Sequence, residues 1–280
     1  DSFDELKTVV FASSSGSRTN LGPQLDGYVG RVNELSELAK CFDEGVRLVT
    51  LKGTGGAGKT RLSRRYARTQ IEILEGGAWF VDLTEARSPK GVVHAAAVAL
   101  EVPLGGADFD GLVTQMGYAI AGRGPVLMVL DNFEQVVNHA AETIGRWQSM
   151  APEARFLVTS RESLRLPGEQ IFSLSPLSES EAAVLFELRA RAAGASWLET
   201  AEIRDAITGI VQQLDGLPLA IELAAARAKL LSPVQIRDRL DQRFELLRQG
   251  RRGQSERQSS LRGLIDWSWE LLKPWEQAAL

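Results

Sequence analysis

The chain has 280 residues, of which 44% are hydrophobic and 24% are charged, and its formal net charge is −4. This composition is that of a soluble globular protein, long enough for one large domain or two ordinary ones. The negative charge gives no general attraction to nucleic acid or to an anionic membrane. Any DNA contact must therefore come from a local patch or from a domain outside this sequence.

The expected compartment is the cytoplasm. Cys41 is the single cysteine, which excludes an intrachain disulfide and favours a reducing environment. No apolar run approaches the length that crosses a bilayer, and the N-terminus has no charged-then-apolar signal pattern. We therefore expect a cytoplasmic protein without membrane contact.

Residues 1–26 are predicted to be a linker from an upstream domain. Residues 12–26, ASSSGSRTNLGPQLD, are rich in serine, glycine and other polar residues and have little to bury. The chain starts at Asp1 rather than at a methionine and stops at Leu280 within an apolar helical pattern. We expect a longer polypeptide on both sides.

Residues 53–60 read GTGGAGKT and fit the phosphate-binding loop pattern of a glycine, four free positions, then glycine, lysine and a hydroxyl residue. The glycines allow backbone conformations in which successive N–H groups turn toward a phosphate. Lys59 supplies a positive charge for the outer phosphates, and Thr60 begins a helix with its hydroxyl placed for Mg²⁺. The candidate nucleotide-binding residues of this segment are Gly53, Thr54, Gly55, Gly56, Ala57, Gly58, Lys59, Thr60 and Arg61.

The flanks of this loop favour a nucleotide site over a flexible glycine-rich turn. Residues 46–52, VRLVTLK, form a short β-type run that enters the loop. After the loop, four residues recur at helical spacing and predict a helix; they are Leu62, Tyr66, Thr69 and Ile73. Strand, glycine loop and helix is the context that the motif requires.

Residues 27–175 alternate short β-type runs with helical stretches. The middle runs are nearly continuous in apolar residues, as in strands that are buried on both faces of a parallel sheet. The sequence predicts an α/β fold, a three-layer P-loop NTPase domain with a parallel sheet. The predicted strands are 46–51, 78–83, 126–130, 156–159 and 170–174.

The run PVLMVLDN, residues 125–132, is an apolar strand that ends in an acid. Asp131 is expected to hold Mg²⁺ across from Thr60. Asn132 follows at a position where an acid could orient the attacking water, and an amide cannot accept that proton. Glu134 is the nearest carboxylate that could substitute, with a solvent-facing or helix-capping role as the alternative. We therefore expect slow or conditional hydrolysis.

Arg161 closes the segment FLVTSR, where a strand emerges toward the same edge of the sheet. A guanidinium group there can reach the terminal phosphate of a nucleotide. The alternative is a surface arginine in a salt bridge.

Residues 176–250 change to helices alone and predict a small helical domain. Ser178 and Glu181 form a capping box at the start of the first helix. The stripe of the second helix ends near Gly216, Pro218 suits the first turn of the third, and Ser232 caps the fourth. The two stripes are Ile203, Ile207, Ile210 and Leu214, and Ile236, Leu240, Phe244 and Leu247. Residues 251–280 are predicted to be a linker and the start of a further, truncated helical unit.

In order along the chain, the motifs VGR, GTGGAGKT, LDNFEQV, VTSR, GEQIFSLSPLS, LDGLPLAIELAAAR and IDWSWELL resemble those of the STAND class of signalling NTPases. The resemblance covers residues 27–280 and extends to the ATPase modules of bacterial LuxR-type and AfsR-type transcription regulators. It implies that Val29, Gly30 and Arg31 line the adenine and ribose side of a nucleotide, that Arg161 senses the terminal phosphate, and that Pro218 presses on the base. It also implies that the last segment opens a winged-helix domain.

The resemblance implies a switch that binds ATP or ADP with Mg²⁺, self-associates when activated and contacts DNA only through domains outside this sequence. A regulator of transcription is the first hypothesis. The second is a defence or signalling protein whose N-terminal domain is an enzyme, and the third is a metabolic ATPase or kinase. The core motifs are shared by the first two hypotheses, so the flanking domains would discriminate them.

Overall fold

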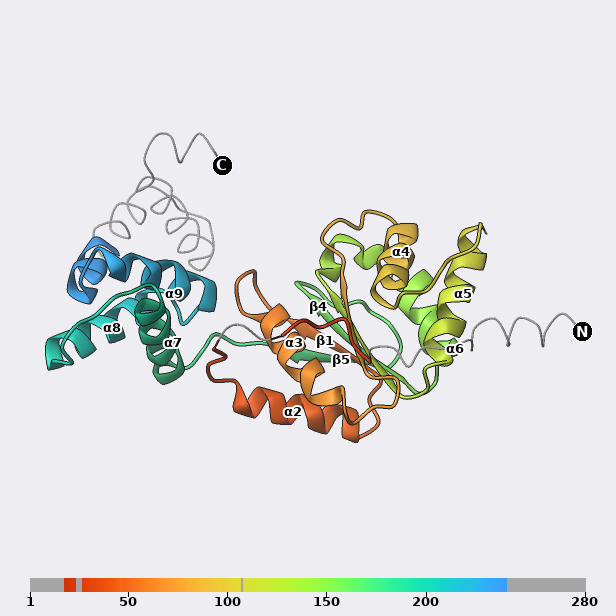
Figure 1. The fold of residues 1–280 in the computed structure, drawn as a ribbon, viewed down its shortest axis with the longest axis horizontal. Helices are drawn as coiled ribbons and strands as arrows, with labels where there is room; N and C mark the ends of the chain where they lie inside the picture. Colours follow the sequence, from red (N-terminus) through yellow and green to blue (C-terminus); the bar gives the residue numbers. More distant parts are fainter. Residues whose placement is uncertain (1–17, 24–26, 107, 241–280) are drawn as a thin grey trace, which may run out of the picture. The chain divides into compact units, whose positions relative to one another are not determined.

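The computed structural model describes residues 18–23, 27–106 and 108–240 (Figure 1). The chain divides into two compact units. The first comprises Asp1–Gln24, Val32–Gly55 and Lys59–Leu174, and the second comprises Leu25–Arg31, Gly56–Gly58 and Ser175–Leu280. The predicted winged-helix start at 251–280 and most of the predicted linker at 1–26 lie outside the described residues.

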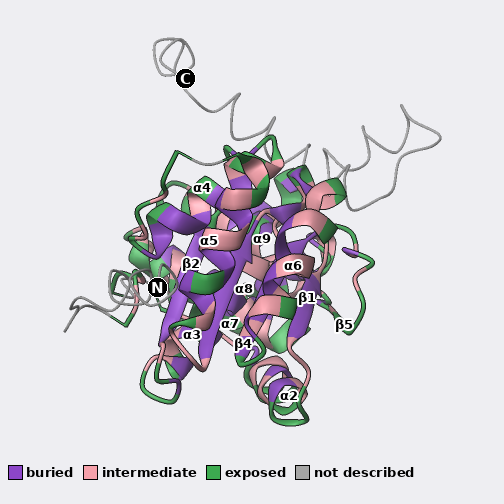
Figure 2. Cartoon of the chain, turned by 90° about the vertical axis from the view of Figure 1, so that its right-hand side faces the viewer, coloured by how far each residue is buried: buried purple, intermediate pink, exposed green. Residues whose placement is uncertain are grey.

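The core of the first unit is a five-stranded parallel sheet in the order β2-β3-β4-β1-β5, so the predicted fold class and all five predicted strands are confirmed. The three strands β3, β4 and β1 lie in the interior of the sheet and are buried almost throughout (Figure 2). Their apolar runs explain this, because a strand covered on both faces has no solvent-facing side. The strands are β1 Leu48–Lys52, β2 Ala78–Asp82, β3 Val126–Asp131, β4 Ala154–Ser160 and β5 Glu169–Ser173.

Helices cover both faces of the sheet (Figure 1). Alternate residues of β3, Val126, Met128 and Leu130, join one large apolar cluster with the helices α4, α5 and α6. Helices α2 and α3 pack together, and α3 contacts β2, β3 and β4 from the opposite face. The helices are α2 Val32–Asp43, α3 Lys59–Gln70, α4 Pro89–Ala99, α5 Phe109–Ala121 and α6 Arg146–Met150, the last preceded by short turns at Phe133–Gln135, Val137–His139 and Ala141–Gly145.

The helix predicted after the loop is confirmed as α3, but it ends at Gln70, before Ile73. Leu62 and Tyr66 are buried, but Thr69 is exposed and Ile73 lies beyond the helix with 68% of its surface accessible. The other buried residues of α3 are Ser63, Ala67 and Gln70. A polar-rich helix has too few apolar residues to define its inner face by pattern alone, so the predicted helical spacing extended too far.

Within the predicted linker, residues 18–23 lie along the free edge of β2. Thr19 forms an isolated parallel bridge with Ala78. The Asn20 side chain donates to Phe80 O and accepts from Phe80 N, both at 2.7 Å. This pairing covers a sheet edge that would otherwise present unpaired backbone groups.

The second unit is helical in its described part. The capping box is present, since Ser178 Oγ accepts from Glu181 N and the Glu181 carboxylate accepts from Ser178 N. Pro218 occupies the first position of α9 as expected. The fourth predicted helix is seen over residues 233–240, and its Phe244 and Leu247 lie outside the described residues. The helices are α7 Glu179–Ala192, α8 Ala201–Gln213 and α9 Pro218–Ala225, followed by a short turn at Ala226–Lys229.

Gly216 sits at a backbone position that requires glycine. Its φ is +62°, and a Cβ there would overlap the carbonyl oxygen of Leu177, whose N–H donates to Gly216 O at 3.0 Å. The Gly-Leu-Pro sequence therefore joins α8 to α9 by a close backbone approach that a side chain would block.

We predict that Gly216→Ala destabilises the helical unit by more than about 1 kcal/mol, because it adds both left-handed strain and a backbone clash. Gly194→Ala is the matched control, since Gly194 has φ +89° but no heavy atom within 4 Å of the position that a Cβ would occupy. Urea unfolding followed by circular dichroism measures both. Equal losses in the two variants would show that the approach to Leu177 adds nothing.

Candidate nucleotide-binding site

The phosphate-loop sequence connects the carboxyl end of β1 to the first turn of α3. Gly56 and Gly58 have φ of +79° and +91°, which few residues other than glycine adopt. Gly53 and Gly55 do not have positive φ, so the expectation of special backbone at all four glycines holds at two. At Gly55 a Cβ would meet only Arg161 Nη2, at 3.6 Å.

The ammonium group of Lys59 is held over its own loop. Nζ donates to Gly53 O at 2.9 Å and to Thr54 O at 3.0 Å. Burial lowers the pKa of Lys59, and the nearby charge of Arg161 acts in the same direction, whereas Glu134 and Asp131 oppose it. Lys59 therefore shares one electrostatic environment with the other candidate residues of the first unit.

Asp131 is the centre of a hydrogen-bond network at the carboxyl edge of the sheet. Thr60 Oγ1 lies 2.9 Å from both carboxylate oxygens, and Thr159 Oγ1 donates to Oδ1 at 2.6 Å. Asp131 is 3% exposed, so water cannot replace these donors. The helix start after the loop, the end of β3 and the end of β4 are thereby joined through one carboxylate.

Burial raises the pKa of Asp131, and the hydrogen bonds from Thr159 and Thr60 counter that shift in part. Asp82, which pairs in register with Asp131 on β2, raises it further by its charge. The Asp82 pKa is lowered, chiefly by the Thr84 hydroxyl, which donates to Asp82 Oδ1 at 2.5 Å. The two neighbouring carboxylates therefore have pKa values that move apart.

The donor set at this edge fits a magnesium ion. A threonine hydroxyl and a carboxylate are the hard oxygen ligands that Mg²⁺ takes from a protein when phosphate oxygens supply others. Thr60 and Asp131 would hold such an ion, which would neutralise charge on a phosphate chain. In residues 18–23, 27–106 and 108–240, no group of three or more His, Cys, Asp or Glu side chains is placed to hold a metal by itself.

Asn132 has a left-handed backbone, with φ +62°. Its N–H donates to Thr159 Oγ1 at 3.0 Å, and its side-chain amide donates to Thr84 Oγ1 at 2.9 Å. The amide thus serves to fix the turn after β3, which agrees with the expectation that it is no proton acceptor.

Glu134 and Arg161 form an ion pair, with 3.1 Å between Arg161 Nε and Glu134 Oε1. The Glu134 side chain is 18% exposed and that of Arg161 is 69% exposed. Glu134 Oε2 is buried and has no hydrogen-bond partner among the described residues. Glu134 is therefore neither solvent-facing nor a helix cap, since Asn132 precedes the short helix that contains it.

In the second unit, Gly30 and Arg31 form a left-handed turn, with φ of +69° and +64°. Arg31 is 4% exposed; its N–H donates to Glu181 Oε1 at 2.8 Å, and its Nη2 donates to Ser175 O at 2.7 Å and to Ala57 O at 3.4 Å. A Cβ at Gly30 would overlap the Glu181 carboxylate. Val29 beside them is partly buried.

Glu181 has two tasks that its capping-box pattern does not reveal. Burial alone would raise its pKa, but hydrogen bonds from Ser178 and from Arg31 N lower it overall. One oxygen serves the start of α7 and the other holds the Gly30–Arg31 turn. Only the folded chain brings residues 150 positions apart together.

Pro218 and Leu219 begin α9 and lie close to Gly56 and Gly58, two glycines of the phosphate loop that belong to the same unit. Leu219 N donates to Gly56 O at 3.2 Å, and the Pro218 ring lies 3.8 Å from the position of a Cβ on Gly58. The predicted contact of Pro218 with a nucleotide base stays a prediction.

Of the other residues of the loop sequence, Thr54 and Arg61 are exposed, whereas Ala57 is buried.

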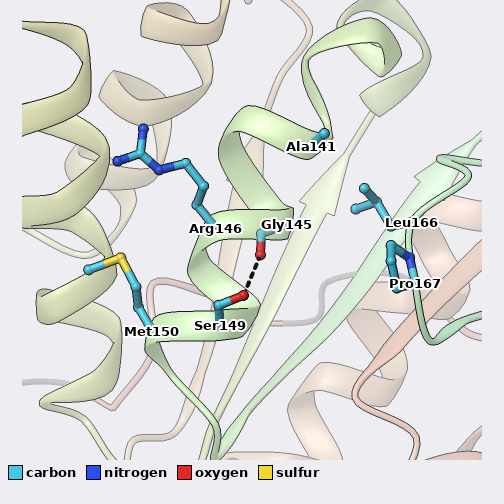
Figure 3. A pocket seen from close by; sticks show the side chains of 7 residues that line it. All are labelled: Ala141, Gly145, Arg146, Ser149, Met150, Leu166 and Pro167. Carbon is cyan, nitrogen blue, oxygen red and sulfur yellow. Dashed lines mark hydrogen bonds between the residues drawn. The ribbon is translucent and has the colours of Figure 1, made fainter.

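A separate hollow of the first unit, about 510 Å³ in volume, contains none of the predicted site residues (Figure 3). Ser149 donates to Gly145 O there at 3.2 Å, and Arg146 is directed instead to Asp110. It is lined by Ala141, Gly145, Arg146, Ser149, Met150, Leu166 and Pro167.

Thr84 and Thr159 fix the carboxylates of this edge, and neither was predicted from the sequence. The signal for Thr159 was present, because it lies two residues before Arg161 on a strand next to β3. The pairing of β3 with β4 was needed to see it.

The fold is that of P-loop NTPases, and residues 43–161 match the family model described as "AAA domain". Two solved structures share the fold. They are a Walker-type ATPase of Pyrococcus abyssi, with TM-score 0.56, 13% identity and coverage of 82% of this chain and 77% of that one, and a STAND protein with a tetratricopeptide repeat sensor from Pyrococcus horikoshii, with TM-score 0.53, 13% identity and coverage of 93% and 35%.

The chain is homologous to mycobacterial proteins. It is 40% identical over 233 residues to the Mycobacterium tuberculosis protein named "Putative HTH-type transcriptional regulator Rv0890c", covering 82% of this chain and 26% of that protein. It is 34% identical over 260 residues to "Uncharacterized protein Rv0894" of the same species, covering 91% and 64%. The chain thus spans about a quarter of the regulator's length.

Among the described residues, no helix is long and apolar enough to span a membrane.

We predict that Asp131→Asn raises stability at neutral pH in buffer without nucleotide or Mg²⁺. The pKa of Asp131 is raised in the folded state. Its favourable contribution to the free energy of unfolding is therefore complete below the unfolded-state pKa of about 3.9, and it is lost as the pH rises through the folded-state pKa. The variant should have a higher urea midpoint than the wild type at pH 7, and the difference should shrink toward pH 4. Asp205→Asn, at an exposed position of α8, is the control. A lower midpoint at pH 7 for Asp131→Asn would contradict this account.

Proposed function

We propose that the chain is the ATP- and ADP-binding switch module of a multidomain bacterial regulator of transcription, with slow ATP hydrolysis. The observation that carries the proposal is the convergence of Lys59, Thr60, Asp131, Glu134 and Arg161 within one hydrogen-bonded and charged network. Nucleotide binding as such is implied by the AAA domain match.

Each residue has a distinct task in this proposal. The N–H groups of the glycine loop and the start of α3 receive the phosphates, as helix N-termini do. Lys59 moves its three donors from the carbonyls of its own loop to phosphate oxygens. Thr60 and Asp131 supply oxygen ligands for Mg²⁺, which neutralises phosphate charge when bound. Arg61 and Thr54 remain exposed at the rim.

Arg161 and Glu134 distinguish ATP from ADP in this proposal. A terminal phosphate competes with Glu134 for the guanidinium group, because both are anions within reach of one flexible side chain. Release of Glu134 leaves a carboxylate that can accept a proton from an attacking water, a task that Asn132 cannot perform. Hydrolysis is slow because this base must first lose its ion pair.

The switch itself requires differential affinity for two arrangements of the protein. Moving a two-state equilibrium from 1:99 to 99:1 takes about 5.5 kcal/mol, which the exchange of ADP for ATP would share with an inducer. Val29, Gly30, Arg31 and Pro218 would contact the nucleoside. Self-association of the ATP state, a cytoplasmic location and DNA contact through other domains complete the proposal.

The relation to the mycobacterial regulator favours transcription as the output. A defence or signalling protein whose N-terminal domain is an enzyme is the second candidate, supported by the shared fold of the STAND protein from P. horikoshii. The domain order of the full-length protein discriminates them: a helix-turn-helix domain supports the first and an enzyme domain the second.

Binding of a fluorescent nucleotide analogue, displaced by ATP or by ADP, tests the site. Lys59→Ala should weaken both nucleotides at least tenfold. Arg161→Ala should weaken ATP by about 10- to 100-fold, the worth of a charged hydrogen bond of about 1.5–3 kcal/mol, and ADP by much less. Arg204→Ala, at an exposed position of α8, is the control. Unchanged affinities in Lys59→Ala would refute the assignment, and equal losses of ATP and ADP in Arg161→Ala would remove its sensing role.

We predict that Glu134→Gln lowers single-turnover ATP hydrolysis by about 10²- to 10⁴-fold, the usual contribution of a general base. ATP should bind more tightly, because the amide no longer competes with the terminal phosphate for Arg161, whereas ADP affinity should stay within about threefold. Glu162→Gln serves as the matched control at an exposed position beside Arg161. Hydrolysis unchanged by Glu134→Gln would assign the base to another group.

A further inference from the structure

The tip of the phosphate loop, Gly56–Gly58, belongs to the second unit, together with the start of α9 and the turn that contains Arg31. The carbonyl oxygen of Gly56 accepts from Leu219 N at 3.2 Å, and that of Ala57 accepts from Arg31 Nη2 at 3.4 Å. Two consecutive carbonyl groups of the loop are thus bound by donors from segments that are distant in the sequence. The glycine pattern of the loop predicts neither bond.

The N–H group of Leu219 is well placed for this bond. Leu219 is the second residue of α9, and the first four N–H groups of a helix have no partner within the helix. The approach to the loop is close enough to require glycine at position 56: Gly56 has φ +79°, and a Cβ there would lie 2.9 Å from the Leu219 Cβ. A side chain at this position would therefore push the start of α9 away from the loop.

The guanidinium group of Arg31 is directed to backbone carbonyls. Arg31 is 4% exposed, and its Nη2 also donates to Ser175 O at 2.7 Å. The Glu181 carboxylate, which closes the capping box of α7, holds the backbone of Arg31 by accepting from its N–H at 2.8 Å. The Arg31 side chain therefore fixes backbone groups, a task that differs from the nucleoside contact expected of residues 29–31.

Holding a carbonyl group also fixes the N–H group of the same peptide unit. The peptide bonds between Gly56, Ala57 and Gly58 are trans, since no cis peptide bond occurs among the described residues. In a planar trans peptide the C=O and N–H groups point in opposite directions. The two donors therefore orient the N–H groups of Ala57 and Gly58 toward the opposite side of the loop. The N–H groups of such a glycine loop are the groups that bind phosphate.

We propose that the backbone N–H of Leu219 and the guanidinium group of Arg31 are positioning groups, which set the N–H groups of Ala57 and Gly58 for a phosphate before a nucleotide binds. The inference rests on the proposed function, because it takes the loop to hold the phosphates of ADP and ATP. Donors that are already oriented bind an anion without the cost of ordering the loop. Because binding and orientation are linked, a bound phosphate in turn favours the state in which α9 holds the loop.

Displacement of a fluorescent ADP analogue from the 280-residue chain, by ADP and by inorganic pyrophosphate in buffer with Mg²⁺, tests the inference. Pyrophosphate carries phosphates without a nucleoside. Leu219→Pro removes the donor N–H at a position where a helix tolerates proline. It should weaken ADP and pyrophosphate by the same factor, about fivefold or more, as the loss of one hydrogen bond predicts. The ratio of the two affinities, which reports the nucleoside contact, should stay within about twofold of the wild type.

Two variants are matched to Leu219→Pro. Leu219→Ala removes the side chain but keeps the N–H, and it should weaken both probes by less than Leu219→Pro does. Lys90→Pro places a proline directly after Pro89 at the start of α4, as Leu219→Pro does after Pro218 in α9. Lys90→Pro should leave both affinities unchanged. Circular dichroism melts check that each variant is folded.

Arg31→Met tests the second donor independently of Leu219→Pro. It removes the guanidinium group and keeps a long side chain, and it should also weaken ADP and pyrophosphate equally, by about fivefold or more. Arg123→Met is the matched control, because Arg123 is a partly buried arginine of the first unit that donates to two backbone carbonyls, those of Leu100 and Ala119. The control should leave both affinities unchanged.

Three results would overturn the inference. The first is a loss of ADP affinity in Leu219→Pro and Arg31→Met with pyrophosphate affinity unchanged, which would assign these groups to the nucleoside. The second is that these variants change neither affinity, or change both no more than Lys90→Pro and Arg123→Met do. The third is a wild type that binds ADP but from which millimolar pyrophosphate does not displace the analogue, because a loop that is already oriented binds phosphates alone. A wild type that binds neither ADP nor ATP would instead refute the proposed function.

Discussion

The buried carboxylate of Asp131 is the constraint on which the candidate site depends. A charged carboxylate that is 3% exposed is costly unless donors replace its hydration, and Thr60 and Thr159 do so. These hydrogen bonds tie the first turn of α3 to the ends of β3 and β4. Because parallel strands end at one edge of the sheet, the same tie places Arg161 and Glu134 next to the phosphate loop. The pKa of Asp131 is nevertheless raised, so these donors only partly replace the water that the carboxylate loses on burial.

Much of the fold was predictable because its signals are local. Five apolar runs, the loop GTGGAGKT, the Ser178 capping box and Pro218 at a helix start each depend on a few consecutive residues. The inner face of α3 was not predictable in the same way, since its arginines outnumber its apolar residues and the helical spacing to Ile73 was wrong. The order of the strands needs contacts between distant segments, which no local pattern states.

In the candidate site too, the residues with local sequence signals were predicted and most of the others were not. Lys59, Thr60, Asp131, Glu134 and Arg161 were predicted from motif and strand position, and the structure brings them together. Thr159 and the second task of Glu181 were missed, because each acts on a residue far away in the sequence. Thr84 was missed although Asp82, whose carboxylate it fixes, lies two residues before it. A salt bridge was the predicted alternative for Arg161, and Arg161 does form one, but its partner Glu134 was not predicted; this ion pair changes the reason for expecting slow hydrolysis. A candidate base exists, but an arginine holds it.

The net charge of the chain is negative, but helix α3, directly after the phosphate loop, carries four of its 25 arginines and no acidic residue. The central claim is that Thr60 and Asp131 bind Mg²⁺ together with a nucleotide held by the loop. Calorimetric titration of the wild-type chain with ATP, with and without Mg²⁺, tests it most directly. The account predicts saturable one-to-one binding that Mg²⁺ strengthens by at least about tenfold, or about 1.4 kcal/mol. Binding of equal strength in EDTA, or no saturable binding at millimolar ATP, would contradict it.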